Sequence, residues 1–269
     1  MYDFLKKTIT WAFSIITAIF TFVPEVAFEI CKWTQRNAVN ITINRIILLS
    51  IIIALTAIIY GIHQTIRRKV TIKGENYSVQ IEYGDIFEML DCKKIIAFDE
   101  CFTTEIGNAP HEIKEKSICG QYLRKHPIEN IQALIDVARL KPSRSKSKYQ
   151  GKLKYDSGML LPREDYLLMA FAKLDETGNG YLSLDELLDC LSLLWKEINK
   201  YYAQCDVCVP ILGSGITRIK GEQISQQKLL DIIISSYQLS AHKIKEPCKL
   251  RIVCKKSRNF SLNRIGQNL

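Results

Sequence analysis

An uninterrupted apolar segment near the N-terminus is the feature that most restricts what this chain can form. From Ile46 to Ile62 the sequence contains no charged side chain, and it remains largely apolar back through Arg45 to Ile41. The combined length is about the 20 residues that a helix needs to cross the hydrocarbon core of a bilayer. Tyr60 has the position of an interfacial aromatic side chain. We therefore predict a transmembrane helix here.

A second apolar stretch, from Thr8 to Val23, precedes the first along the chain. It follows two lysines and ends before a Pro-Glu pair. A cleaved signal peptide begins in the same way, but no small-residue cleavage site follows. An interfacial or re-entrant helix is the other alternative. We predict a transmembrane hairpin over residues 1–69, with spans of about 8–28 and 43–63.

Basic residues set the expected orientation of this hairpin. Arg67, Arg68, Lys69 and Lys73 follow the second span directly. Because such clusters stay on the cytoplasmic side, we expect both the N-terminus and the large C-terminal part to be cytoplasmic.

Composition narrows the class of the remaining chain. The protein has 269 residues, 47% of them hydrophobic, and a formal net charge of +9. The apolar fraction excludes a disordered chain. Nine cysteines, an odd number at irregular spacing, argue against a secreted disulfide scaffold and for a reducing compartment.

Strand and helix patterns alternate after the hairpin. A turn at residues 74–76 separates two short β-patterns, which predicts a β-hairpin. Periodic apolar residues predict two helices, and short apolar runs predict further strands, of which the run 166–172 also fits a helix. We therefore expect an α/β fold, a mixed sheet with helices packed on it. The helices are predicted at 183–202 and 225–239, and the strands at 70–72, 77–81, 94–98, 166–172, 205–212 and 250–254.

Two patterns resemble metal sites. The segment from Asp175 to Glu186 matches an EF-hand calcium loop at several positions, but Thr177 is a poor ligand and no second copy exists. The alternative is a turn followed by a helix that Ser183 and Glu186 cap as a capping box, which we favour. Cys205 and Cys208 have the spacing of a zinc or redox pair without partners, so we interpret them as core or near-core thiols. We predict no metal site.

The segment from Arg139 to Lys154 is strongly basic and contains no acidic residue. Serine and proline interrupt it, which predicts a mobile loop. Contact with anionic lipid head groups or with nucleic acid is one interpretation of its charge, and a solvated loop that the anchor keeps close to the bilayer is the simpler one. We expect no nucleic-acid partner.

Two glycine-containing turns are candidate ligand sites. Pro210 to Gly215 is an apolar strand end that runs into Gly-Ser-Gly, where backbone N–H groups can turn toward a diphosphate. Gly84 and Asp85 follow another strand, and a carboxylate placed there can accept a hydrogen bond from an adenine amino group.

These segments carry a family resemblance. Gly84-Asp85-Ile86, the strand from Ile95 to Phe102, and Pro210 to Gly215 resemble, in order and spacing, a macro domain, the ADP-ribose-binding fold. The complete layout resembles the membrane-anchored effector of bacterial Thoeris anti-phage systems. The resemblance implies a macro-like three-layer mixed sheet with helices on both faces over residues 70–257, followed by a tail at 258–269. The ligand-binding residues that it implies are Asp85, Ile86, Asp99, Gly120, Leu212, Gly213, Ser214, Gly215, Ile216 and Arg218.

The chain also departs from hydrolytic macro domains, which resemble one another in an Asn-Ala-Ala-Asn stretch and a Gly-Gly-Gly loop that it lacks. We therefore expect binding without turnover, and no cofactor. The resemblance implies an effector at the bacterial inner membrane that binds an ADP-ribose-derived signal made from NAD by a partner TIR enzyme, then self-associates and disrupts the bilayer. The alternatives are a membrane-bound ADP-ribosyl hydrolase and a calcium-binding membrane sensor.

Overall fold

The computed structural model describes residues 2–215, 218–219, 224–257 and 260–265. The chain divides into two compact units, Met1–Arg67 and Arg68–Leu269. Ile216, a predicted ligand residue, lies outside the described residues, as does part of the predicted tail.

The first unit consists of two helices, α1 (Tyr2–Phe22) and α2 (Asn37–Ile66), which pack against each other. Buried Thr8, Ala12 and Ile16 lie four residues apart on α1 and form one face. Among the described residues only α2 is long and apolar enough to cross a membrane, over Asn37–Ile62 with mean hydropathy 2.4, whereas the apolar part of α1, Thr8–Phe22, is shorter. The first span was predicted to reach about residue 28, whereas helix α1 ends at Phe22, shortly before Pro24, and a separate 3-10 turn, η1 (Glu25–Phe28), follows.

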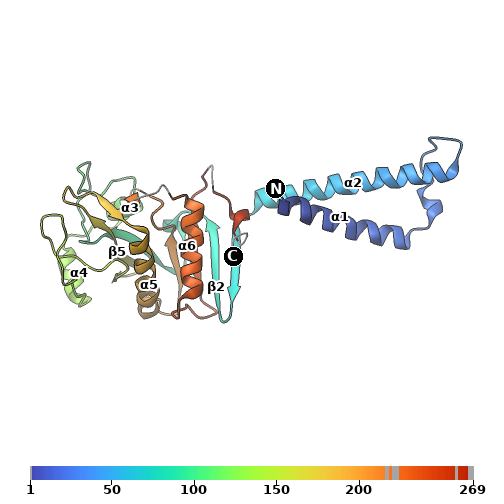
Figure 1. Ribbon diagram of the computed structural model, residues 1–269. Coiled ribbons are helices and arrows are strands. Elements are labelled where there is room, and N and C mark those ends of the chain that lie inside the picture. Colours follow the sequence, from blue (N-terminus) through green and yellow to red (C-terminus); the bar gives the residue numbers. More distant parts are fainter. Residues whose placement is uncertain (1, 216–217, 220–223, 258–259, 266–269) are drawn as a thin grey trace. The chain divides into compact units, whose positions relative to one another are not determined.

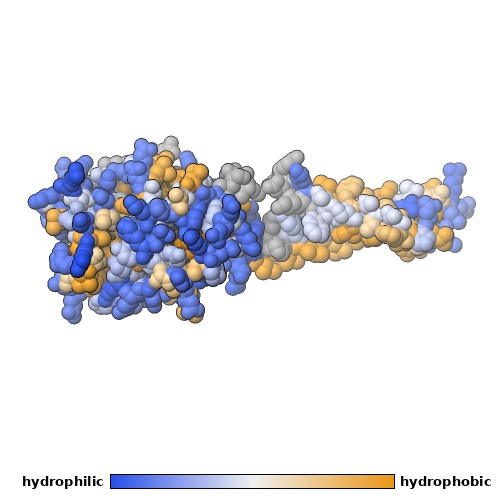
Figure 2. Space-filling view, turned by 90° about the horizontal axis from the view of Figure 1, so that it is seen from below, coloured by the Kyte–Doolittle hydropathy of each residue, from blue (hydrophilic) through white to orange (hydrophobic). Residues whose placement is uncertain are grey.

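Polar side chains of α2 organise the connection between the two helices. The Asn40 carboxamide oxygen accepts hydrogen bonds from the backbone N–H groups of Trp33 and Thr34, at 3.0 and 2.8 Å. The Trp33 indole donates to Asn44, whose amide nitrogen donates in turn to the Phe28 carbonyl. Figure 2 shows hydrophilic surface at this end of the unit and hydrophobic surface along its length.

The second unit is built on a mixed sheet. Its described strands form one nine-stranded sheet in the order β1-β2-β9-β7-β3-β5-β6-β8, with β4 paired to β5. The five strands β2, β9, β7, β3 and β5 are parallel to their neighbours in that order. The strand bounds are β1 (Lys69–Gly74), β2 (Tyr77–Tyr83), β3 (Cys92–Asp99), β4 (Leu160–Arg163), β5 (Tyr166–Leu174), β6 (Gly180–Leu182), β7 (Asp206–Pro210), β8 (Arg218–Ile219) and β9 (Leu250–Cys254).

Helices cover both faces of this sheet (Figure 1). On one face α5 (Leu184–Tyr201) and α6 (Gln226–Leu239) contribute Trp195, Leu230 and Tyr237 to the larger apolar core. On the other face α3 (Ile118–Lys125) and α4 (Ile131–Val137) pack a smaller core around Phe98 and Tyr122. The strand and helix patterns predicted a mixed sheet with helices packed on it, and the family resemblance implied this three-layer arrangement.

The predicted elements of the second unit are largely present, with instructive exceptions. The ambiguous run 166–172 is strand β5, and the predicted hairpin is β1–β2. The sequence patterns did not predict β4, β6, β8, α3 and α4, which are short and weakly periodic. Phe260 and Leu262 of the predicted tail are buried in the larger core, where they lie beside Tyr83. The turn η3 (Leu262–Arg264) therefore belongs to the domain.

Candidate functional site

The carboxyl ends of the parallel strands form the edge at which a ligand is expected. The chain reaches β3 and β5 through elements on one face of the sheet and returns to β7 and β9 through α5 and α6 on the other. Ligands of open parallel sheets lie outside the carboxyl ends at such a reversal. The predicted segments at Asp85 and Gly213 follow β2 and β7, so both begin at this edge.

Asp85 caps a short 3-10 turn, η2 (Ile86–Glu88), directly after β2. Its Oδ1 accepts a hydrogen bond from the Phe87 N–H at 3.0 Å. The Gly84 N–H donates to the Cys254 carbonyl of β9 at 3.1 Å, which fixes where the turn begins. Ile86 is buried, whereas Asp85 is half-buried. The aspartate therefore has a defined place at the sheet edge, next to apolar side chains.

The Gly-Ser-Gly turn follows β7 as expected. Gly213 has φ of 76°, a left-handed conformation that favours glycine. The Ser214 hydroxyl donates to the Ile211 carbonyl at 2.6 Å. A Cβ at Gly215 meets no atom within 4 Å, so this position is open. Leu212 is buried in the larger core, so only its backbone can face a ligand.

Two further predicted ligand residues, Gly120 and Asp99, make contacts that stabilise the domain itself. Gly120 lies in the first turn of α3, where its N–H is already capped by the Ser117 hydroxyl at 3.0 Å. A Cβ there meets the Lys114 carbonyl oxygen at 2.4 Å, so close backbone packing requires the glycine. Asp99 is buried and accepts hydrogen bonds from the N–H groups of Cys101 and Thr103. Burial raises the pKa of its carboxyl group. Ligand contact by either residue stays a prediction.

Arg218 lies in β8, which pairs with β6, and its side chain is outside what the structure describes.

A small cavity of about 20 Å³ lies where the Asp85 turn meets α3 and the ends of β7 and β9. Asp99, Gly120 and the Gly-Ser-Gly turn are not among its lining residues. A nucleotide needs a pocket of roughly 300 Å³ or more, so binding here requires the rim to open. Of the predicted ligand residues that the structure describes, Asp85 and Ile86 line it, whereas Phe87, Ile118, Gln121, Val253 and Lys255 were not predicted. Lys255 directly follows strand β9, and that position is the signal that could have identified it. The lining residues are Gly84, Asp85, Ile86, Phe87, Ile118, Gln121, Pro210, Val253 and Lys255.

Two thiols lie beneath this cavity. Cys92 of β3 and Cys208 of β7 are buried with Ile86 and Val253 in one small apolar cluster, and their sulfur atoms are 2.9 Å apart. The Cys208 thiol accordingly has a raised pKa, since the neighbouring Cys92 and burial both disfavour its thiolate. Cys208 is thus a core residue, and Cys205 is partly exposed. In the part of the chain that the structure describes, no group of three metal-binding side chains occurs.

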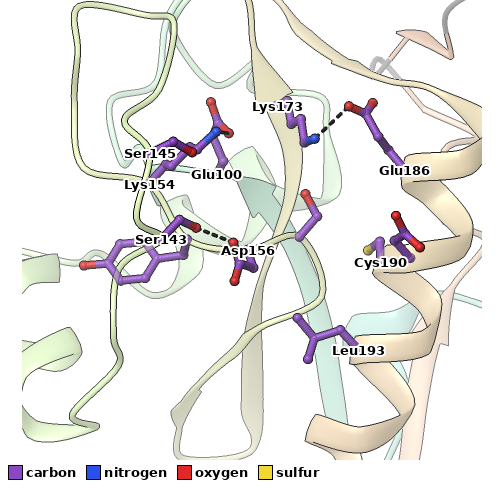
Figure 3. Close-up of a pocket in the computed structure, with 12 residues that line it drawn as sticks. Glu100, Ser143, Ser145, Lys154, Asp156, Lys173, Glu186, Cys190 and Leu193 are labelled. Carbon is purple, nitrogen blue, oxygen red and sulfur yellow. Dashed lines mark hydrogen bonds and ion pairs between the residues drawn. The ribbon is translucent and has the colours of Figure 1, made fainter.

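A larger cavity of about 330 Å³ contains none of the predicted ligand residues (Figure 3). Its charged side chains largely pair with one another. Lys173 donates to Glu186 at 2.7 Å, and Ser143 donates to Asp156. Four carboxylates against two lysines line it, a balance that repels a diphosphate. Its charged residues are Glu100, Asp156, Glu186, Asp189, Lys154 and Lys173.

The calcium-loop pattern is a turn and a capped helix. Asp175 Oδ1 accepts hydrogen bonds from the N–H groups of Thr177 and Asn179, both at 2.9 Å, within the β5–β6 turn. Ser183 and Glu186 form a complete capping box at the start of α5. The strand β5, rather than a helix, precedes the turn, so the capping alternative is confirmed.

Glu186→Gln therefore tests capping against calcium binding. We expect a loss of about 1 kcal/mol of unfolding free energy, because the Lys173 ion pair is lost and the cap weakened. Thermal unfolding, with calcium calorimetry on the parent and the variant, measures both effects. Micromolar calcium affinity in the parent that disappears in the variant would contradict this interpretation.

The second unit is thus a three-layer α/β module of the kind that holds its ligand at the carboxyl edge of parallel strands. A sequence profile described as the macro domain of Thoeris protein ThsA matches residues 79–255. Thoeris protein ThsA of Bacillus amyloliquefaciens (strain Y2) is 32% identical over 232 residues, which cover 81% of this chain and 77% of that protein. The chain belongs to the Thoeris ThsA macro-domain family, an antiviral defence family.

Two solved macrodomains are similar more loosely. The Oceanobacillus iheyensis macrodomain with ADP superposes with a TM-score of 0.46 and 11% identity, covering 71% of this chain and 90% of that one. The macrodomain of Thermus aquaticus DarG gives a TM-score of 0.38 at 11% identity, covering 66% of this chain and 98% of that one.

Proposed function

We propose that this protein is a membrane-anchored effector of anti-phage defence. Its macro domain binds an ADP-ribose-derived signal that a partner TIR enzyme makes from NAD, and binding drives self-association and disruption of the inner membrane. The domain binds the signal without hydrolysing it, and it lies on the cytoplasmic side.

The main support for binding of an ADP-ribose-derived signal is that residues far apart in the chain line one cavity. Four separate parts of the chain line it together: residues 84–87, Ile118 with Gln121, Pro210, and Val253 with Lys255. They supply what an adenosine diphosphate requires: a carboxylate for the amino group, apolar side chains for the base, and a lysine for the phosphates. The Gly213 turn begins three residues after Pro210 and offers backbone N–H groups to the same ligand.

Exposed aliphatic side chains on α2 support the proposal that this helix anchors the protein in a membrane. None of the apolar window in Asn37–Ile62 is buried within the protein, which distinguishes it from a core helix. The match to the Bacillus relative covers more of the chain than the second unit alone provides, so it extends into the helical unit. The exposed residues of the span are Ile46, Ile47, Ile51, Leu55, Ile58, Ile59 and Ile62.

Asp85→Ala tests the ligand assignment. We expect the Kd of the full-length protein for ADP-ribose to rise about fivefold or more, because one hydrogen bond to the adenine amino group, worth about 1 kcal/mol, is lost. Calorimetry on detergent-solubilised protein, with NAD and amino-acid-linked ADP-ribose as further probes, measures this change.

The matched control is Asp85→Asn, whose amide oxygen still accepts the Phe87 N–H and so retains the cap. Its melting temperature should equal that of the parent, and its affinity should lie between those of the parent and Asp85→Ala. Equal ADP-ribose affinity in all three proteins removes Asp85 from the site. Release of ADP-ribose from a modified protein substrate would instead establish the hydrolase alternative.

A further inference from the structure

The basic segment 139–154 is an ordered feature of the second unit, contrary to the mobile loop that its composition predicts. Its chain closes on itself, because the Ser143 N–H donates to the Lys154 carbonyl at 2.8 Å and the Ser147 N–H donates to the Lys152 carbonyl at 2.9 Å. Tyr149 is buried and stacks on His111, with ring centroids 5.5 Å apart.

A buried carboxylate holds the base of this segment. Glu100, 2% exposed, accepts a hydrogen bond from the Ser147 hydroxyl at 2.5 Å, and Lys154 Nζ lies 3.7 Å from its other oxygen. The Tyr155 N–H donates to the Glu100 carbonyl at 2.8 Å. One carboxylate directly after β3 thus satisfies the inner groups, and the remaining cations stay exposed on an ordered backbone, with Lys152 Nζ 5.0 Å from the centroid of the Tyr149 ring. The exposed basic residues are Arg139, Lys141, Arg144, Lys146, Lys148 and Lys152.

Two exposed aliphatic side chains accompany these charges. Leu153 is 54% exposed within the segment, and Val137 is 84% exposed at the end of α4. Both ends of the segment rest on the same smaller core, through Leu140 on one side and Tyr155 on the other. Aliphatic side chains among exposed lysines and arginines match a bilayer interface, where the cations meet lipid phosphates and the aliphatic groups enter the acyl boundary.

We propose that the segment 139–154, together with Val137, is a docking surface for anionic lipid head groups. A nucleic-acid surface of this kind normally presents aromatic rings on which bases stack. Here both tyrosines of the region, Tyr149 and Tyr155, are buried, and the exposed apolar groups are aliphatic. The observations therefore favour a lipid surface. Each exposed cation contributes roughly fivefold to the affinity for such a surface.

Amide hydrogen exchange on the full-length protein in nanodiscs tests this proposal. In discs of phosphatidylcholine with one-third phosphatidylglycerol, amides of residues 144–153 should exchange at least about fivefold more slowly than in pure phosphatidylcholine discs. Raised salt should remove the difference, because it screens exposed charges. The triple variant R144Q/K146Q/K148Q should show no difference between the two discs.

The matched control K196Q/K245Q/R264Q removes the same three charges from exposed positions elsewhere in the unit, and it should retain the parent response. Equal exchange of the parent in both discs overturns the proposal, as does slower exchange with single-stranded RNA than with anionic discs. The experiment depends on the proposed membrane anchor in one step only, the incorporation of the protein into the nanodiscs. A chain that fails to co-purify with discs refutes the anchor, whereas an assembled chain whose segment does not respond refutes the docking surface alone.

Discussion

Gly215→Glu should abolish signal-dependent toxicity while the protein still accumulates in the membrane. In the ligand-free fold a Cβ atom at Gly215 meets nothing within 4 Å, so we expect the substitution to leave the fold intact. With a diphosphate at the turn, however, the added carboxylate repels the phosphates and displaces charge-assisted hydrogen bonds. We expect a loss of about 3 kcal/mol, more than a hundredfold in Kd for ADP-ribose.

Three measurements check this result: calorimetry with ADP-ribose, membrane fractionation, and growth of cells that co-express the partner enzyme. Gly215→Ala is the control that keeps the backbone change without the charge, and it should retain most of the affinity. Gly213→Ala differs in kind, since φ of 76° strains any side chain there and lowers the stability of the fold itself. Full responsiveness of Gly215→Glu would falsify the assignment of this turn to a diphosphate.

The double variant Ile51→Arg, Leu55→Arg should have the opposite effect to Gly215→Glu: it should keep ligand binding and lose the membrane location. Both side chains are about half exposed and lie one turn apart on α2. An arginine near the centre of a bilayer costs roughly 3 kcal/mol on insertion scales, so the pair costs about 6 kcal/mol. We expect the protein to leave the membrane fraction and to lose toxicity, with unchanged ADP-ribose binding. Deletion of residues 1–69 should likewise remove the protein from the membrane fraction and abolish toxicity, while ADP-ribose binding persists.

The control for this pair is Ile51→Ala with Leu55→Ala, which shortens the same side chains without adding charge and should remain in the membrane. An effector that acts through the bilayer is contradicted if the arginine variant is as toxic as the parent. It is also contradicted if the chain that lacks residues 1–69 is toxic. Loss of ADP-ribose binding in the arginine variant contradicts the independence of the two units.

Features with a short-range cause could be predicted from the sequence. The apolar run of α2, the hairpin β1–β2 and the capping box at Ser183 each depend on residues close together in the chain. The turns at Asp85 and Gly213 were found because each directly follows a recognisable strand. Lys255 has the same relation to β9 and could have been found in that way.

Only the tertiary structure decided how these local elements combine, because the deciding contacts join residues far apart in the chain. The composition of the basic segment predicts a mobile loop. The structure instead shows it held by a hydrogen bond from the Ser147 hydroxyl to Glu100, which lies 47 residues earlier in the chain. The need for a glycine at position 120 comes from a tertiary contact, because a Cβ there would lie 2.4 Å from the Lys114 carbonyl oxygen. The sequence by itself located six of the described strands to within a few residues, and it located a helix that is apolar enough for a membrane. Which strand ends meet depends on the order of strands in the sheet, which local propensity does not encode.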